Sequence, residues 1–87
     1  MIIIKNMSVG DWGNTKALFT IEVDGVWISG FKVMETNGKN WIAKPTRKTK
    51  DGEYIDTVGM SKEKKDTLEK IALEYFQKII ESKISYR

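Results

Sequence analysis

The sequence predicts an α+β fold in which an antiparallel sheet of four to five strands carries one long C-terminal amphipathic helix. Three observations lead to this prediction. Asp24-Gly25 and Asn37-Gly38 each separate two apolar segments by a residue pair that tolerates positive φ, which is typical of β-hairpin turns. Alternating or β-branched segments lie within residues 2–58, and residues 61–83 have the apolar periodicity of a helix.

The first two strands flank a polar segment. Residues 2–7 are rich in isoleucine and predict a strand, whereas residues 8–15 contain two glycines and several polar residues and predict a loop. Residues 17–23 alternate between apolar and polar side chains, so Phe19 and Ile21 should share one face of a half-buried strand.

Three further strands follow. The strand expected over residues 26–34 contains Ser29-Gly30, a pair that suggests a bulge or a close approach of another backbone segment. Residues 40–44 predict the next strand, and Pro45 should end its pairing because proline has no N–H group. Residues 53–58 predict a short fifth strand.

The C-terminal helix is expected to begin after Ser61, which is a suitable N-cap, and to carry Glu63 in its first turn. Its apolar positions recur every three or four residues, so one face should lie on the sheet. These positions are Leu68, Ile71, Ala72, Tyr75, Phe76, Ile79 and Ile80.

Composition limits the possible chemistry. The 87 residues suit one domain, residues 1–87, and include neither cysteine nor histidine. Thiolate and imidazole ligands, a Cys nucleophile and the commonest general base are therefore excluded. Carboxylates remain, but they are scattered along the chain, so we expect no catalytic residues, no metal site and no cofactor.

The N-terminal apolar run, residues 1–4, is too short for a signal-peptide core or a membrane span. We therefore expect a cytoplasmic protein without membrane contact. A short chain also buries a limited fraction of its surface, and self-association would cover more of it, so a homodimer is expected.

Positive charge is concentrated in one segment. The chain has a net charge of +3, and the segment from Lys44 to Lys50 contains no acidic residue. Clustered Lys and Arg side chains suit phosphate groups, so we predict nucleic-acid binding here, without a preference between DNA and RNA at this point. The candidate residues, which include three lysines opening the helix, are Lys44, Arg47, Lys48, Lys50, Lys62, Lys64 and Lys65.

Other interpretations stay open at this point. The basic segment is equally compatible with a solvated turn that aids solubility. Trp41 and Tyr54 flank it and suit either base stacking or packing within the sheet. A non-enzymatic protein-interaction module, using a sheet edge or the helix flank formed by Leu73 and Ile80, is the alternative function.

Residues 17–77 resemble the stage V sporulation protein G (SpoVG) family of septation and gene-expression regulators. The resemblance includes Trp41-Ile42-Ala43-Lys44-Pro45 and a helix containing Leu-Glu-Tyr-Phe. Its most specific part is the segment from Lys44 to Tyr54, with a proline, a hydroxyl residue, two basic residues, a threonine and then Asp-Gly-Glu-aromatic.

The resemblance implies a small antiparallel sheet with a C-terminal helix, a homodimer, and binding of DNA and also RNA in bacterial gene expression and cell division, including sporulation. Arg47 and Lys48 match the two basic positions of the family. Lys50 occupies a position where the family usually has proline, and Ile55 replaces a usual basic residue.

Overall fold

The computed structural model describes residues 1–85; residues 86 and 87, which the predicted domain includes, lie outside this description. In chain order the elements are β1 (Ile2–Trp12), β2 (Thr15–Val23), β3 (Val26–Thr36), β4 (Lys39–Ala43), β5 (Thr46–Lys48), β6 (Tyr54–Asp56) and α1 (Lys62–Ser85). The first four strands form an antiparallel sheet in the order β1-β2-β3-β4, and β5 pairs with β6 in a separate ribbon. The predicted α+β class is confirmed.

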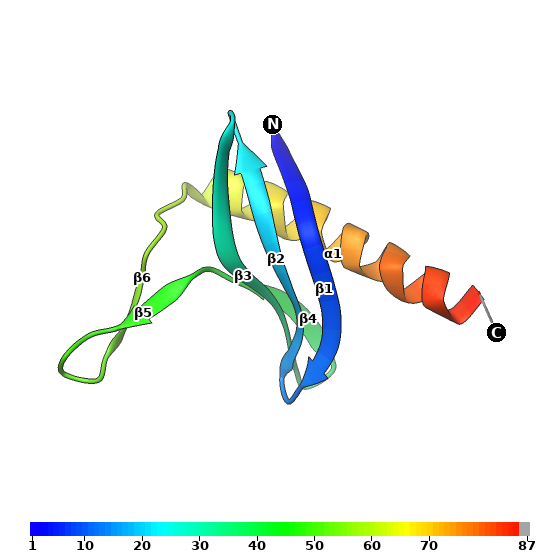
Figure 1. The fold of residues 1–87 in the computed structure, drawn as a ribbon, viewed down its shortest axis with the longest axis horizontal. Helices are drawn as coiled ribbons and strands as arrows, with labels where there is room; N and C mark the ends of the chain where they lie inside the picture. Colours follow the sequence, from blue (N-terminus) through cyan, green and yellow to red (C-terminus); the bar gives the residue numbers. More distant parts are fainter. Residues whose placement is uncertain (86–87) are drawn as a thin grey trace.

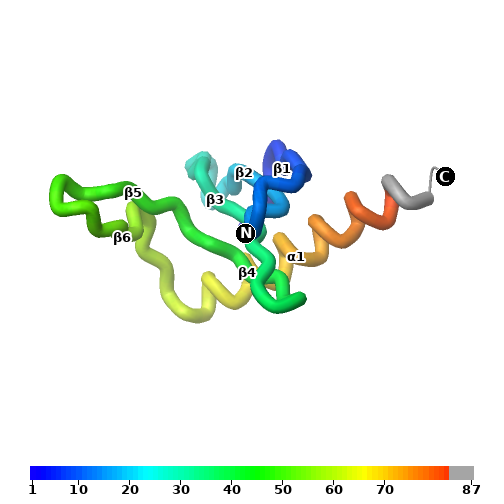
Figure 2. The backbone as a smooth tube through the Cα atoms, turned by 90° about the horizontal axis from the view of Figure 1, so that it is seen from below, coloured from blue at the N-terminus to red at the C-terminus, as the bar shows by residue number. Residues whose placement is uncertain are grey.

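The sheet and the helix form two layers. Figures 1 and 2 show α1 crossing one face of the sheet, while the opposite face has no helix over it. Phe31, Ile21 and Val33 from the sheet and Leu68 from the helix are fully buried between the layers. Burying each such side chain contributes roughly 1.5–3 kcal/mol, so this contact is the main source of stability.

Both predicted hairpin turns are present. Asp24 and Gly25 have φ values of 51° and 82°, and Asn37 and Gly38 have values of 53° and 79°. Positive φ at both central residues defines the type I′ turn, whose twist matches that of the flanking strands. The pairs Val23–Val26 and Thr36–Lys39 flank these turns, which fixes the register of the sheet.

The predicted irregularity at Gly30 is also confirmed. The β2–β3 register shifts between Phe19 and Ile21, opposite Gly30, which has φ +95°. A Cβ atom built on Gly30 would lie 3.2 Å from Cβ of Pro45. The bulge therefore leaves room for the chain to pass β3 as it leaves the sheet.

The predicted loop over residues 8–15 was wrong for most of its length, because β1 continues to Trp12. Two register shifts relative to β2, one of them beside Asn6 with φ 51°, keep this polar segment paired. The ring of Trp12 lies against Gly10, where a Cβ atom would meet ring carbons at 2.5–2.8 Å. Pairing with β2 and this covering ring thus override the low strand propensity of glycine.

The predicted fifth strand exists but does not join the sheet. β6 pairs with β5, which consists of residues from the predicted basic loop. The chain turns away from β4 at Pro45, which cannot donate a hydrogen bond to continue the ladder. The structure therefore has a four-stranded sheet and a two-stranded ribbon.

The helix begins where predicted. Oγ of Ser61 accepts a hydrogen bond from the backbone N–H of Lys64 at 3.2 Å, and its carbonyl accepts one from Lys65 at 2.9 Å. The helix continues to Ser85, two residues beyond the predicted end. Within residues 1–85, no helix combines the length and the apolar character needed to cross a bilayer.

We predict that Gly30→Ala lowers the free energy of unfolding by about 1–3 kcal/mol, because alanine is strained at this φ and its Cβ would crowd Pro45. Gly38→Ala shares the positive φ but meets nothing within 4 Å, so it isolates the backbone strain. Urea unfolding should rank Gly30→Ala as the more damaging change. Equal losses in the two variants would show that the Pro45 contact is unimportant.

The β1–β2 hairpin carries an exposed ion pair that should titrate. Nζ of Lys16 donates to Oδ1 of Asp11 at 2.8 Å, and this hydrogen bond lowers the pKa of Asp11. The pair therefore stabilises the hairpin above the ordinary aspartate pKa, and this contribution disappears as the pH falls through the lowered value. Lys16→Met should raise the pKa of Asp11 in an NMR titration, and an unchanged pKa would contradict the assignment.

Candidate nucleic-acid interface

The predicted basic segment forms a ribbon that projects from the sheet. Figures 1 and 2 show β5 and β6 extending sideways, away from both the sheet and the long axis of α1. Thr46, Arg47 and Lys48 pair with Asp56, Ile55 and Tyr54, respectively. Every residue of the two strands is exposed. Neither face of the ribbon is therefore covered.

The tip of the ribbon is a tight three-residue loop. The N–H of Gly52 donates to the carbonyl of Thr49 at 3.0 Å, and the N–H of Thr49 donates to the carbonyl of Glu53 at 2.7 Å. Gly52 has φ +85°. This is a type I turn followed by a left-handed residue, and Lys50 occupies its first central position, where proline is favoured.

The base of the ribbon is closed by polar contacts. Nζ of Lys44 lies 3.1 Å from Oδ2 of Asp56. The N–H and the hydroxyl of Thr57 both donate to the carbonyl of Pro45, at 3.0 and 3.2 Å. Lys44 is thus paired and largely covered, so its charge is already balanced within the protein.

Arg47 and Lys48 point to opposite faces of the ribbon, because successive residues of a strand alternate. Arg47 shares its face with Ile55, and Lys48 shares the other with Tyr54. Within residues 1–85, no ion pair forms on Arg47, Lys48 or Lys50. The ribbon therefore presents unpaired cations on both faces and one at its tip.

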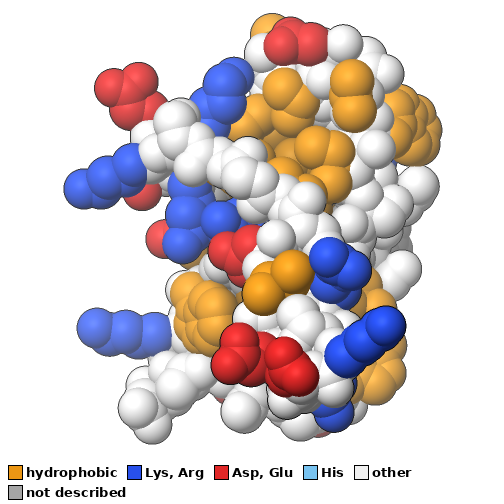
Figure 3. All heavy atoms as spheres, turned by 90° about the vertical axis from the view of Figure 1, so that its left-hand side faces the viewer, with side chains coloured by type: hydrophobic (Ala, Val, Ile, Leu, Met, Phe, Trp, Pro, Cys, Tyr) orange, Lys and Arg blue, Asp and Glu red, His pale blue; other side chains and the backbone are white. Residues whose placement is uncertain are grey.

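The ribbon is less uniformly basic than the segment from Lys44 to Lys50 suggested. The turn and β6 add three carboxylates, from Asp51, Glu53 and Asp56. Figure 3 looks onto this side of the molecule, where Lys and Arg side chains are interspersed with acidic ones. Since Asp56 pairs with Lys44 at the base, the two other carboxylates remain near the tip.

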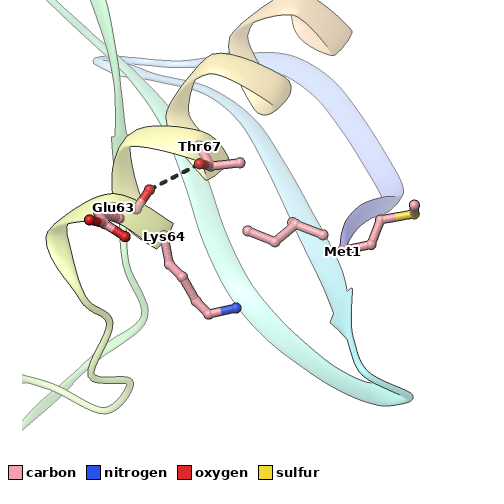
Figure 4. Close-up of a pocket in the computed structure, with 5 residues that line it drawn as sticks. Met1, Glu63, Lys64 and Thr67 are labelled. Carbon is pink, nitrogen blue, oxygen red and sulfur yellow. Dashed lines mark hydrogen bonds between the residues drawn. The ribbon is translucent and has the colours of Figure 1, made fainter.

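The three predicted lysines at the start of α1 stand apart from the tip of the ribbon. Residues 57–61 connect β6 to the helix, and Lys62, Lys64 and Lys65 are exposed in its first turn. The side chain of Lys64 lines a shallow pocket beside Met1, and no ribbon residue lines this pocket (Figure 4). The structure therefore does not gather the seven predicted residues into one cluster.

The two flanking aromatic residues differ in their surroundings. Tyr54 is 70 % exposed on the ribbon. Trp41 lies on the open face of the sheet, where its Nε1 donates to Oγ1 of Thr36 at 3.1 Å. Tyr54 is the one that shares a ribbon face with Lys48 and could meet the same ligand.

Within residues 1–85, no three carboxylates converge into a metal site.

Two comparisons with known proteins agree on one protein family. A family model described as SpoVG matches residues 1–78. A curated protein of Lachnospira eligens named "Putative septation protein SpoVG" is 35% identical over 68 residues, which is 76% of this chain and 77% of that protein. The family-model match includes the whole sheet, the ribbon and most of α1.

We predict that Lys50→Pro stiffens the tip of the ribbon, because proline presets the φ required at this position of the turn. Hydrogen exchange at the N–H groups of Gly52 and Thr49 should slow, since both donate within the loop. Lys50→Ala removes the same charge without fixing φ and should leave exchange nearly unchanged. Faster exchange in Lys50→Pro would contradict this turn geometry.

Proposed function

The chain belongs to the SpoVG family, and on this basis we propose that it is a homodimeric regulator that binds nucleic acid through the β5–β6 ribbon. The relative from Lachnospira eligens is named as a septation protein, so bacterial septation and sporulation are the processes in which we place the regulator. The proposal assigns it no catalytic step.

One observation carries the binding proposal. Arg47, Lys48 and Lys50 are exposed on a ribbon that projects from the molecule, and within residues 1–85 they have no acidic partner. Side chains in this situation lose little by exchanging water for phosphate oxygens. Arg47 can bind a phosphate with two hydrogen bonds, whereas the lysines act as point charges. Lys44 is left out because Asp56 already balances it.

Lys62, Lys64 and Lys65 have a secondary part in this proposal. They lie at the end of α1 that follows the ribbon in the chain, so they would add long-range attraction for a polyanion rather than direct contacts beside Arg47. Their effect should therefore be strongest at low salt.

The open face of the sheet supports the homodimer. Ile3, Leu18 and Trp27 lie on the face opposite α1, and Trp27 is 57 % exposed. A second copy covering this face would bury apolar surface that the single chain leaves in water. The two-fold axis would also duplicate the ribbon.

The alternative of a protein-interaction module has less support at the helix flank. Leu73 and Ile80, the proposed helix flank, are half-buried and pack against the core. A partner could still add to the outer edge of β1 or β4, but no described residue favours such a partner over a nucleic acid.

We predict that the double variant Arg47→Ala/Lys48→Ala weakens binding to duplex DNA at least tenfold near physiological salt. The slope of log affinity against log salt should fall by about two, because each lost phosphate contact changes it by about 0.9. Fluorescence anisotropy over a salt series measures both quantities. The melting temperature should hardly change, because both side chains are exposed.

The matched control is Lys70→Ala/Lys78→Ala, which removes two exposed lysines from α1 outside the ribbon. It changes the net charge by the same amount, so it should reduce affinity only slightly. A parent-like affinity for both DNA and RNA in the ribbon variant would contradict the binding proposal.

We predict that sedimentation equilibrium gives the mass of a dimer, and that Leu18→Asp shifts it toward the monomer by placing a charge on the open sheet face. Lys70→Ala, which changes the net charge by the same amount at an exposed position of α1 on the other side of the sheet, is the control. A parent protein that sediments as a monomer at all concentrations would refute the homodimer.

A further inference from the structure

The ribbon has a geometry that selects among nucleic acids. We infer that it enters the major groove of B-form duplex DNA, with Arg47 and Lys48 on the phosphates of opposite groove walls and the turn at Lys50-Asp51 against the base edges. This inference rests on the proposed nucleic-acid-binding function and names the ligand of that same site.

The ribbon carries cations on both of its faces. Arg47 and Lys48 are neighbours in β5 and so point in opposite directions. A flat polyanionic surface could contact only one of them at a time. A groove offers a phosphate-lined wall to each face. Every residue of both strands is exposed, so both faces are accessible to a ligand.

The thickness of the ribbon matches the width of the major groove of B-DNA. A two-stranded ribbon with its side chains is about 10 Å thick, judged from the spacing of packed sheets. The major groove of B-DNA is about 12 Å wide and about 8.5 Å deep, whereas the minor groove is only about 6 Å wide. The major groove of an RNA duplex is deep and narrow, so it does not admit the ribbon.

Acidic and basic side chains occupy different parts of the ribbon. Asp51 and Glu53 lie at the turn, whereas Arg47 and Lys48 lie on the strand behind it. Phosphates would repel carboxylates, so the tip is unsuited to contact with the DNA backbone. The floor of the major groove instead presents amino groups of cytosine and adenine, which donate to carboxylates, and guanine atoms, which accept from lysine.

This arrangement separates two tasks. Phosphate contacts from Arg47 and Lys48 would position the ribbon without reading sequence, and Lys50 and Asp51 at the tip would read base edges. Residues 49–53 reach beyond the paired strands, which end at Lys48 and Tyr54, and the three-residue loop lies at their outer end. The tip is therefore the part that can approach the groove floor.

The test compares three probes at one salt concentration: a 20-base-pair DNA duplex (about two helical turns), its single strand, and the RNA duplex of the same sequence. We expect the DNA duplex to bind at least tenfold more tightly than the others. Methyl green, a major-groove ligand, should displace the protein, whereas netropsin, a minor-groove ligand, should not.

The single variants Arg47→Ala and Lys48→Ala test the two-wall arrangement. On the DNA duplex each should lower the salt slope by about 0.9, and the double variant by the sum, since each residue has its own wall. On the single strand the two effects should not add, because only one face can be engaged at a time.

Asp51→Ala tests the tip. It should strengthen binding to random-sequence duplex, since a carboxylate is lost, and relax base preference in a selection from a randomised duplex pool. An unchanged preference would overturn the assignment of the tip to base reading.

Two outcomes distinguish the inference from the proposed function. Equal affinity for duplex and single-stranded DNA, or displacement by netropsin alone, would overturn insertion into the major groove, while weakened binding by the ribbon variants would still support nucleic-acid binding. If Arg47→Ala/Lys48→Ala binds all three probes as tightly as the parent, both the inference and the proposed function fail.

Discussion

The packing of α1 against one face of the four-stranded sheet is the contact on which the rest of the structure depends. Phe31 and Val33 at the centre of the sheet and Leu68 on the helix are fully buried there. Because only one helix packs on the sheet, the apolar side chains of the other face, among them Leu18 and Trp27, stay exposed. The ribbon, which adds no buried side chain, relies on the sheet to hold its base in place.

Gly30 and Pro45 determine where the chain leaves the sheet after β4. The bulge at Gly30 brings β3 close to the proline ring, and the proline ends the ladder of β4. The carbonyl of Pro45 then accepts both hydrogen bonds from Thr57, so the chain leaves and returns at one point. The direction of the ribbon is thus determined by backbone geometry at its base, while its charged side chains stay free.

Local rules predicted the elements whose signals are local. The Asp24-Gly25 and Asn37-Gly38 turns, the bulge at Gly30 and the Ser61 cap each follow from the conformational preferences of a few residues. The extension of β1 to Trp12 could not be predicted in this way, because it depends on pairing with β2 and on a tryptophan ring covering Gly10. Long-range pairing overrides propensity in such segments.

The sequence identified the basic residues of the candidate site, but it could not predict the directions of their side chains or their ion pairs. Residues 44–50 are charged and contain a proline, so they resemble a loop, and a loop gives no rule for the direction of each side chain. Once Thr46–Lys48 is a strand, alternation separates Arg47 from Lys48. The ion pair of Lys44 with Asp56 likewise requires the return strand, which brings a residue twelve positions away to the base of the ribbon.

The ribbon also leaves two β-edges open to solvent, since β5 and β6 each have one neighbour. Open edges can pair with other chains and start aggregation, and charged side chains are a common protection against it. Arg47 and Lys48 would therefore have a second role, which is to disfavour pairing of these edges with strands of other chains. Selection for solubility and selection for a polyanionic ligand would therefore favour the same residues.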